Sequence, residues 1–506
     1  MKKVVLIFLA IIFVFAGCSQ EPAPDNQINE LSAVPTAEAI TSAPTEQIAT
    51  PSPTAEPTAT PLPEKPKYIF IVIGDGMGQG AASLGEIYAR LEAEDMSVGA
   101  QWESFDVKRM VGAMGDSSSG GTSLATGAKS RQGYISLDIN ANSLYTIMDR
   151  AKANGLDTGV VSNSSLADAT PAVFLSNTDS RYEYGGIIAQ IPTSNVDYMA
   201  GGGMRFFGSS SQADILPAED CYGIEAYYKG KDDIMDQLGE CGYSLYYGRQ
   251  GAVQMLEALQ NGEVSHEKAI YALSLVYMPW EIEKYKADSM QSFADVPNLV
   301  EMTEMGIRNL SQNPDGFVLM VEEAFIDKAA HMGSTIRQVY QVKLLNDTLK
   351  VIMEFYNQHP YETLVVLTAD HETGKYLYNQ ELIDQFKTLP DFRWSDDGDE
   401  LSEFLIDQWD FHSYESYYYN QIKNANSDVW ENEGDSRVQA LAEITATTAR
   451  KYGTIITTKA HSFLDVPLYV VGNGSDEFAE CTHISEVPQA ICRIMGWDAL
   501  PEIETE

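Results

Sequence analysis

Short apolar runs rich in β-branched residues recur along the chain and constrain how it can fold. They cover residues 68–73, 159–161, 317–321, 364–367 and 466–471. Runs this short that are apolar on both faces are typical of buried parallel strands. Helical patterns lie between them, as over residues 335–355. The alternation predicts an α/β fold, a three-layer sandwich with a central, mostly parallel sheet and helices on both faces.

Acidic residues follow several of these runs. They are Asp75, Glu322, Asp327 and Asp370, with His371 next in the chain. Ligands of such folds bind beyond the carboxyl ends of the strands, so we expect these side chains to converge on one edge of the sheet. Clustered carboxylates repel one another unless they are protonated or bound to cations. A polar residue that simply ends a strand explains one or two cases, whereas the whole set predicts a metal site.

Histidines accompany these acids at spacings that suit a metal site. His331 lies four residues after Asp327 and so on the same face of a helical turn, while His371 adjoins Asp370 and His461 lies just before the last apolar run. Mixed imidazole and carboxylate ligands suit zinc, and sets made only of oxygen suit magnesium. The other histidines have no such neighbours and are expected to be structural. They are His266, His359, His412 and His483.

Residues 115–129 begin with small polar residues and continue in a helical pattern. A flexible loop of serine and glycine is the simplest interpretation of such a segment. The segment leads directly into a helix, however, and helix N-termini bind anions through their free N–H groups. A serine at that place becomes a nucleophile if a metal ion lowers the pKa of its hydroxyl.

Taken together, these segments resemble the alkaline phosphatase family over about residues 66–498. The matching segments are Ile73-Gly-Asp75-Gly, Asp116-Ser117 with Thr126-Gly127-x-Lys129, Asp168-Ala-Thr170-Pro-Ala, Arg181, Glu322 to His331, Thr368-Ala-Asp370-His371 and His461. The spacing identifies Ser117, rather than Ser118 or Ser119, as the nucleophile. The sequence departs from the family at Ser118, where alanine is usual, and at Gly120-Gly121, and these departures are expected to loosen the start of the helix.

The resemblance implies two zinc ions and one magnesium ion as cofactors. The ligands of one zinc ion would be Asp327, His331 and His461. The ligands of the second zinc ion would be Asp75, Asp370, His371 and the Ser117 oxygen. The ligands of magnesium would be Asp75, Thr170 and Glu322. Arg181 would bind phosphate directly, while Asp168 and Lys328 would act through water on magnesium and phosphate.

The activity that the resemblance implies is hydrolysis of small phosphate monoesters through a phosphoserine intermediate. A phosphodiesterase of the same superfamily is an alternative, although such enzymes commonly use threonine and lack the metal set that Thr170 and Glu322 would complete. A sulfatase would need a C/S-x-P-x-R context, which does not surround Ser117. A non-catalytic, anchored protein that binds phosphate or metal would not need Ser117, Arg181 and Lys328 together.

The N-terminal residues are expected to direct export and anchoring. Residues 1–17 place Lys2 and Lys3 before an apolar run, as signal peptides do, and Phe15-Ala16-Gly17-Cys18 resembles a bacterial lipobox. The run has about thirteen residues, whereas a membrane-spanning helix needs about 20, which favours a lipoprotein lipidated on Cys18 over a transmembrane anchor. The mature protein would be extracytoplasmic and attached to the bacterial cell membrane.

Composition divides the rest of the chain. Residues 18–66 contain ten of the 21 prolines and no aromatic residue, which predicts an extended, disordered linker. Residues 67–498 would form the catalytic domain, and 499–506 a tail. Within the domain, residues 378–455 resemble the family's crown-like insertion, which lies near the site and at the dimer contact, so the resemblance is consistent with a homodimer.

Charge and cysteine content limit the partners and the chemistry. The chain has 73 Asp and Glu residues against 33 Lys and Arg, a net charge of −40, and therefore lacks the basic face that nucleic-acid binding needs. Besides Cys18, the cysteines are Cys221, Cys241, Cys481 and Cys492, and no C-x-x-C motif indicates a cysteine-based metal or redox site. Disulfides 221–241 and 481–492 are the simplest of three possible connectivities.

Overall fold

The computed structural model describes the chain from residue 63 to residue 503 with gaps. The described residues are 63–82, 106–112, 115–194, 196–208, 234–281, 296–333, 335–374, 377–378, 454–455 and 460–503. The predicted signal peptide, Cys18, nearly all of the linker, Cys221 and His412 lie outside these residues. Within them, no helix combines the length and the apolar character that crossing a membrane requires.

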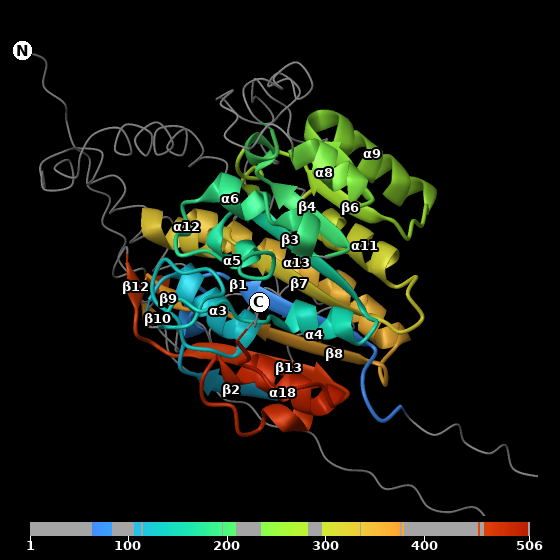
Figure 1. Ribbon diagram of the computed structural model, residues 1–506. Helices are drawn as coiled ribbons and strands as arrows, with labels where there is room; N and C mark the ends of the chain where they lie inside the picture. Colours follow the sequence, from blue (N-terminus) through green and yellow to red (C-terminus); the bar gives the residue numbers. More distant parts are fainter. Residues whose placement is uncertain are drawn as a thin grey trace, which may run out of the picture. The chain divides into compact units, whose positions relative to one another are not determined.

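A nine-stranded sheet forms the centre of the described part of the chain (Figure 1). The strands are β1 (Tyr68–Gly74), β2 (Asp106–Met110), β3 (Asp157–Ser165), β4 (Tyr198–Gly202), β5 (Tyr243–Tyr247), β6 (Lys268–Ala272), β7 (Phe317–Glu323), β8 (Thr363–Thr368) and β13 (Val466–Gly472). Their order across the sheet is β2-β13-β8-β1-β7-β3-β4-β6-β5. Each of the predicted apolar runs lies in one of these strands, and the prediction of an α/β fold is confirmed.

One strand runs against the others, which corrects the expectation that all the apolar runs are parallel strands. β13 pairs antiparallel with β8 and with β2, whereas the pairings among β8, β1, β7, β3, β4, β6 and β5 are parallel. Because β13 is reversed, the residues that precede it lie at the edge where the parallel strands end. His461, which precedes β13, therefore reaches the same edge as Asp75 and Asp370.

Helices flank the sheet on both faces (Figure 1). One layer contains α9 (Gly248–Asn261), α11 (Leu299–Leu310), α12 (Phe325–Met332) and α13 (Thr335–Gln358). The other contains α3 (Ser117–Thr126), α4 (Ile147–Ala153), α5 (Ala169–Ala172) and α18 (Glu486–Met495). Shorter elements are α6 (Tyr184–Ile188), α7 (Ile191–Ser194), α8 (Ile234–Glu240), η1 (Met204–Phe206) and η5 (Ser475–Phe478). The observed arrangement is a sheet between two helical layers.

The core is built around β1, which lies inside the sheet between β8 and β7. Every residue of β1 is buried, as its uninterrupted apolar sequence predicts for a strand covered on both faces. Phe70 packs edge-on against Phe317 of β7 and Phe355 of α13, with ring centroids 5.3 Å and 5.8 Å apart. These aromatic contacts pack α13 against β1 and β7, two of the strands that lead to the acidic residues.

Residues 195–300, which supply no predicted site residue, contribute β4, β5 and β6 to the main sheet. The cysteines differ from the sequence-based expectation. Cys481 and Cys492 are buried thiols, so the predicted 481–492 disulfide is wrong, and Cys241 is also a thiol. Cys492 lies on the buried face of α18, where an apolar environment accommodates a thiol without a disulfide.

Most of the predicted insertion lies outside the described residues, but its two ends are described. β10 (Leu377–Tyr378) pairs antiparallel with β11 (Thr454–Ile455), with Leu377 opposite Ile455. The chain therefore leaves and re-enters the domain at one place. This closure lets a long segment be inserted after β8 without disturbing the order of the main sheet.

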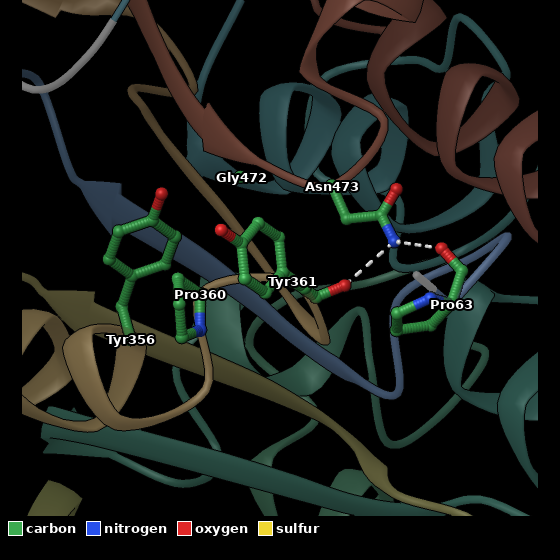
Figure 2. A pocket seen from close by; sticks show the side chains of 6 residues that line it. All are labelled: Pro63, Tyr356, Pro360, Tyr361, Gly472 and Asn473. Atoms are coloured by element: carbon green, nitrogen blue, oxygen red, sulfur yellow. Dashed lines mark hydrogen bonds between the residues drawn. The ribbon is translucent and has the colours of Figure 1, made fainter. Parts of the chain in front are cut away.

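A pocket of about 480 Å³ lies at the edge where the parallel strands begin. It is lined by Pro63, Tyr356, Pro360, Tyr361, Gly472 and Asn473. Figure 2 shows the Asn473 amide donating to the backbone oxygens of Tyr361 (2.8 Å) and Pro63 (3.1 Å). The pocket is thus on the opposite edge of the sheet from Asp75 and Asp370, and its lining carries no ionisable carboxylate or imidazole.

The turn before β7 requires a glycine. Gly316 has φ of +100°, and a Cβ there would lie 2.0 Å from the Lys67 carbonyl oxygen, which accepts the Phe317 N–H at 2.9 Å. Gly262, at the end of α9, also has positive φ (+67°), but a Cβ there would meet nothing within 4 Å. We predict that Gly316→Ala lowers the free energy of unfolding by about 3–5 kcal/mol, and Gly262→Ala by only about 1–2 kcal/mol. Guanidinium denaturation followed by circular dichroism measures both, and equal losses would contradict the steric argument.

Candidate metal and phosphate site

The strand order brings the predicted acidic residues together. β1 lies between β7 and β8, with Ile73 opposite both Glu322 and Thr368. The chain then leaves β1 at Asp75 and leaves β8 at Asp370 and His371. Asp75, Glu322, Asp370 and His371 are all buried, with at most 4% of their surface exposed. Neighbouring parallel strands thus deliver three carboxylates and an imidazole to one edge of the sheet, as predicted.

Asp327 and His331 come from α12, which follows β7. They are one helical turn apart, and His331 Nε2 lies 3.3 Å from Asp327 Oδ1. His461 reaches them because β12 (His461–Ser462) pairs with β9 (Glu372–Thr373), placing His461 opposite Thr373. His461 Nε2 lies 3.0 Å from His331 Nε2 and 3.6 Å from Asp327 Oδ1. Residues separated by 130 positions in the chain therefore share one site.

Ligand atoms of Asp327, His371 and His461 all lie within 4.8 Å of one another, close enough to hold one metal ion. This group differs from the first predicted zinc set in containing His371, while His331 lies beside it. The hydrogen bonds orient the two imidazoles toward the site. His461 Nδ1 lies 2.8 Å from the Gly115 carbonyl oxygen, and since a carbonyl only accepts, this nitrogen carries the proton. Nε2 of His461 is then free to act as a ligand.

Thr373 orients His371 in the same way. The Thr373 hydroxyl donates to Asp327 Oδ1 at 2.5 Å, which leaves its oxygen to accept from His371 Nδ1 at 3.2 Å. Nε2 of His371 therefore presents a lone pair to the site. Burial disfavours the charge of Asp327, but the neighbouring charges of His331, His371 and His461 lower the pKa of its carboxyl below the usual value. The group thus offers one carboxylate and two imidazole nitrogens, a donor set that suits zinc.

A second group consists of Asp75, Asp370 and His371, again within 4.8 Å. His371 Nε2 lies 3.3 Å from Asp370 Oδ2 and 3.6 Å from Asp75 Oδ1. These two carboxylate oxygens are buried and have no hydrogen-bond partner among the described residues. Burial and the charge of Asp370 raise the pKa of Asp75 well above its usual value. Two buried carboxylate oxygens without donors, facing an imidazole, fit a divalent cation.

The residues of the predicted magnesium set adjoin this group. The Thr170 hydroxyl, on α5, lies 3.4 Å from Asp75 Oδ2. Glu322 accepts a hydrogen bond from Ser162 of β3, and its burial raises its pKa to about 8 although Ser162 and Lys328 oppose the shift. The set therefore supplies oxygen atoms only, from two carboxyls and one hydroxyl. That donor type is the one magnesium prefers.

Ser117 begins α3, and its hydroxyl faces the metal groups. Asp116 caps the helix, accepting from the Ser119 N–H, while the Ser119 hydroxyl in turn binds the Asp116 backbone. This capping box exposes the first N–H groups of the helix at Ser117. Ser117 Oγ lies 3.3 Å from His371 Nε2. The predicted nucleophile is therefore within one ligand shell of the second metal group.

The departures from the family pattern do not loosen this helix. The Ser118 hydroxyl donates to Asp116 Oδ1 at 2.5 Å and accepts from the Gly133 N–H at 2.7 Å, which ties the helix start to the loop that follows α3. A Cβ at Gly120 would lie 2.7 Å from the Asp370 carbonyl oxygen, so glycine lets α3 pack directly against the end of β8. The expectation of a looser helix start was wrong, because both residues bring α3 closer to its neighbours.

Two cations border the site on the side of α3 and α5. Arg181 donates from Nη1 to Asp116 Oδ2 (2.9 Å) and from Nη2 to Asp168 Oδ1 (3.3 Å). Lys328 Nζ lies 3.2 Å from Asp168 Oδ2. Burial opposes each of these charges, but the charge of Asp168 raises the pKa of both Arg181 and Lys328, and they in turn lower the pKa of Asp168. All three side chains are therefore ionised, and the two cations are fixed by carboxylates.

Some supporting residues had no sequence signal. Glu323 follows Glu322 and accepts from Asn163 Nδ2 and Gln341 Nε2, each at 2.6 Å, and from the Phe325 and Ile326 N–H groups. Through the Phe325 and Ile326 N–H groups, Glu323 binds the first turn of α12, the helix that carries Asp327 and Lys328. Burial raises the pKa of Glu323 to about 7, while its donors favour the carboxylate. Its partners come from β3 and α13, and no motif links them.

The histidines expected to be structural and described here lie apart from both groups. His266 Nε2 lies 2.7 Å from Asp157 Oδ2, at the start of β3. The His359 ring packs against Tyr68 and Phe355, with centroids 5.3 Å and 4.7 Å apart. None of His266, His359 and His483 is part of a group of three metal-ligating residues among the described residues. His266 therefore offers a matched control for substitutions of the site histidines.

Comparisons with known proteins agree with this geometry. The sequence model of the alkaline phosphatase family matches residues 66–496. Alkaline phosphatase 3 of Bacillus subtilis (strain 168) is 26% identical over 458 residues, which is 85% of this chain and 89% of the relative. Alkaline phosphatase of Escherichia coli (strain K12) is 28% identical over 351 residues, which is 61% of this chain and 71% of the relative.

Solved structures show the same fold. Alkaline phosphatase from the Antarctic bacterium TAB5 superposes with a TM-score of 0.59 at 21% identity, over 86% of this chain and 99% of that one. Alkaline phosphatase of Thermus thermophilus superposes with a TM-score of 0.62 at 17% identity, over 87% of this chain and 93% of that one. At these identities the superpositions establish the shared α/β fold.

The double membership of His371 in the two groups makes it the most informative residue for metal binding. We predict that His371→Ala reduces the zinc retained after gel filtration, because the Asp75 group loses its only imidazole and the Asp327 group loses an adjacent one, whereas His266→Ala retains as much as the unsubstituted protein. Plasma mass spectrometry of the zinc-loaded proteins measures the metal per chain. Equal zinc in all three proteins would contradict the assignment of these groups as metal sites.

Proposed function

Since the chain belongs to the alkaline phosphatase family, we propose that it hydrolyses phosphate monoesters to an alcohol and inorganic phosphate through a phosphoserine intermediate at Ser117. The observation that carries the proposal is the position of the Ser117 hydroxyl. It lies 3.3 Å from His371 Nε2, at a helix N-terminus, beside the buried carboxylate oxygens of Asp75 and Asp370. A serine hydroxyl in that place can be deprotonated and directed at an anionic substrate.

We assign the metal ligands by the donor atoms that the site offers. Asp327, His331 and His461 would hold one zinc ion, and Asp75, Asp370, His371 and the Ser117 oxygen would hold the second. Asp75, Thr170 and Glu322 would hold magnesium. When bound, such ions lower the pKa of a coordinated hydroxyl and stabilise negative charge on the attacking and leaving oxygens.

The side chains of this protein then perform the two displacements. Ser117 Oγ forms a bond to phosphorus as the bond to the ester oxygen breaks, and the alcohol leaves. In the second half, a water oxygen bonds to phosphorus as the bond to Oγ breaks, which releases phosphate and restores the serine. The N–H groups at the start of α3 face the phosphoryl oxygens in both halves.

Arg181 and Lys328 would bind the phosphoryl group in both displacements. The planar guanidinium of Arg181 can contact two equatorial oxygens at once, and Asp116 and Asp168 hold it in place. Lys328, held by Asp168, would act on phosphate through a water molecule. Asp168 thus positions both cations, and the same carboxylate would bind a water on magnesium. Fixed charges of this kind stabilise the transition state without reorganisation.

The N-terminal sequence supports a second, independent proposal. We propose that the protein is a lipoprotein, exported and anchored to the bacterial cell membrane through a lipid on Cys18. The supporting observations are the signal-peptide pattern of residues 1–17, the lipobox-like Phe15-Ala16-Gly17-Cys18 and the proline-rich residues 18–66, which would act as a spacer. A homodimer, which the family resemblance suggests, remains a prediction from the sequence.

For the catalytic proposal, Ser117→Ala is the decisive substitution. We expect it to reduce hydrolysis of p-nitrophenyl phosphate by at least about 10³-fold, because no oxygen remains to form the phosphoserine. Zinc content should stay within experimental error of the unsubstituted protein, since the carboxylate and imidazole ligands are retained. Release of p-nitrophenolate at alkaline pH, with metal analysis of the same samples, provides both values.

The same assay separates the competing functions. A monoesterase cleaves p-nitrophenyl phosphate much faster than bis-p-nitrophenyl phosphate, and a diesterase shows the reverse preference. A binding protein cleaves neither. Undiminished activity of the Ser117→Ala protein would show that another group is the nucleophile, and a preference for the bis-ester would replace the monoesterase proposal.

Anchoring is tested by the substitution Cys18→Ala in the full-length protein expressed in a bacterium with lipoprotein processing. We expect the unsubstituted protein in the membrane fraction and metabolically labelled by a palmitate analogue, because acylation of the Cys18 thiol provides the anchor. The Cys18→Ala protein should lose the label. Labelling that persists in the variant would exclude Cys18 as the lipidated residue.

A further inference from the structure

The segment Tyr277-Met-Pro-Trp-Glu281 supplies none of the proposed metal ligands or phosphate-binding residues, yet it packs against the site. It follows β6 and crosses to the end of β3, where the Met278 N–H donates to the Asn163 carbonyl oxygen at 3.0 Å. Met278 and Glu281 are buried, with 3% and 5% exposure. The Glu281 N–H donates to Gln341 Oε1 at 3.0 Å. The segment is therefore fixed at both ends.

Two aromatic side chains of this segment enclose the first residue of α12. The rings of Trp280 and Phe325 are 4.6 Å apart, and Tyr277 meets Phe325 edge-on at 6.1 Å. Phe325 itself is buried. The two rings and Glu323 thus both contact the start of α12. Lys328 lies one turn further along the same helix.

The Lys328 ammonium lies against the Tyr277 ring. Nζ is 4.9 Å from the centroid of that ring and 5.3 Å from the centroid of Phe325. On its other side, Nζ is 3.2 Å from Asp168 Oδ2. An ammonium within about 6 Å of an aromatic face is attracted by the ring's negative face. The Lys328 ammonium therefore contacts a carboxylate and two rings.

Both residues are partly exposed to solvent, Tyr277 by 41% and the Lys328 side chain by 24%. The ring offers attraction without a competing anion, unlike a second carboxylate at the same place. A charge that is held in place and partly buried interacts with a nearby anion more strongly than a charge that moves freely in water.

We propose that Tyr277 is a positioning residue that holds Lys328 against the phosphate site, and that its ring face, not its hydroxyl, does so. The inference rests on the proposed function in that Lys328 faces bound phosphate. Tyr277 then contributes to phosphate binding, and this contribution depends on Lys328. Without the ring, the flexible lysine side chain samples other rotamers, and part of its interaction with phosphate is lost.

The experiment measures binding of inorganic phosphate to the zinc- and magnesium-loaded full-length protein by isothermal titration calorimetry. Tyr277→Leu should weaken phosphate binding by about 3- to 10-fold, the range that one cation–π contact supports. Tyr277→Phe keeps the ring and should bind within about twofold of the unsubstituted protein. Tyr361→Leu, which removes an exposed tyrosine at the opposite edge of the sheet, should change nothing. Tyr277→Gln gives a second variant without the ring, should the leucine variant fold poorly.

A second arm distinguishes positioning from a general structural role. In a Lys328→Gln background, Tyr277→Leu should cause no further loss of phosphate affinity, because there is no ammonium left to position. An equal loss in both backgrounds overturns the proposal, as does unchanged affinity in both ring-less variants or a loss in Tyr277→Phe as large as in Tyr277→Leu.

Binding and catalysis fail separately in this design. If the unsubstituted protein does not hydrolyse monoesters but still binds phosphate with this dependence on Tyr277 and Lys328, the proposed function is wrong and the positioning role stands. If it hydrolyses monoesters and Tyr277→Leu leaves phosphate affinity unchanged, the positioning role is wrong and the proposed function stands.

Discussion

The mutual repulsion of buried carboxylates is the constraint on which the site depends. The ends of β1, β7 and β8 place Asp75, Glu322 and Asp370 beside one another, away from water. Burial and the charge of Asp370 raise the pKa of Asp75, and burial raises that of Glu322. Such an arrangement is unfavourable unless protons or cations neutralise it. Burial of the apolar strands stabilises the fold, and this burial does not depend on the charge of the residues at the strand ends. Bound cations would turn this destabilising edge into a ligand set.

The reversal of β13 completes the site. An antiparallel last strand begins where the parallel strands end, so the segment before it can reach the carboxyl edge. The short pairing of β12 with β9 then places His461 opposite Thr373, next to His371. A parallel last strand would carry the preceding residues to the other edge, where the pocket around Tyr361 lies. Strand direction and the β12–β9 pairing together therefore bring His461 to Asp327.

The sequence predicts those parts of the molecule in which a residue pattern has one physical cause. Apolar runs identify β1, β3, β7, β8 and β13, because both faces of these strands are covered. A search for apolar runs does not identify β4 and β5, because β4 ends in two glycines and most of β5 is only half-buried. Their strand character comes from neighbours in the sheet, as expected where context overrides propensity. The same holds for the site. Motifs bring the ligating residues to notice, but the roles of Thr373, Glu323 and Tyr277 depend on contacts between distant segments.

An acidic protein that binds an anion needs positive charge close to the binding site. The chain carries a net charge of −40, and the described site holds more carboxylates than cations. Arg181 and Lys328 do not reverse this balance, because Asp116 and Asp168 already pair with them. Without bound cations this excess of carboxylates would repel phosphate, so under the proposed function metal ions would serve substrate binding as well as the chemistry. The paired carboxylates then have a different part. They would fix the two organic cations in one orientation, so that little reorganisation is needed when phosphate binds.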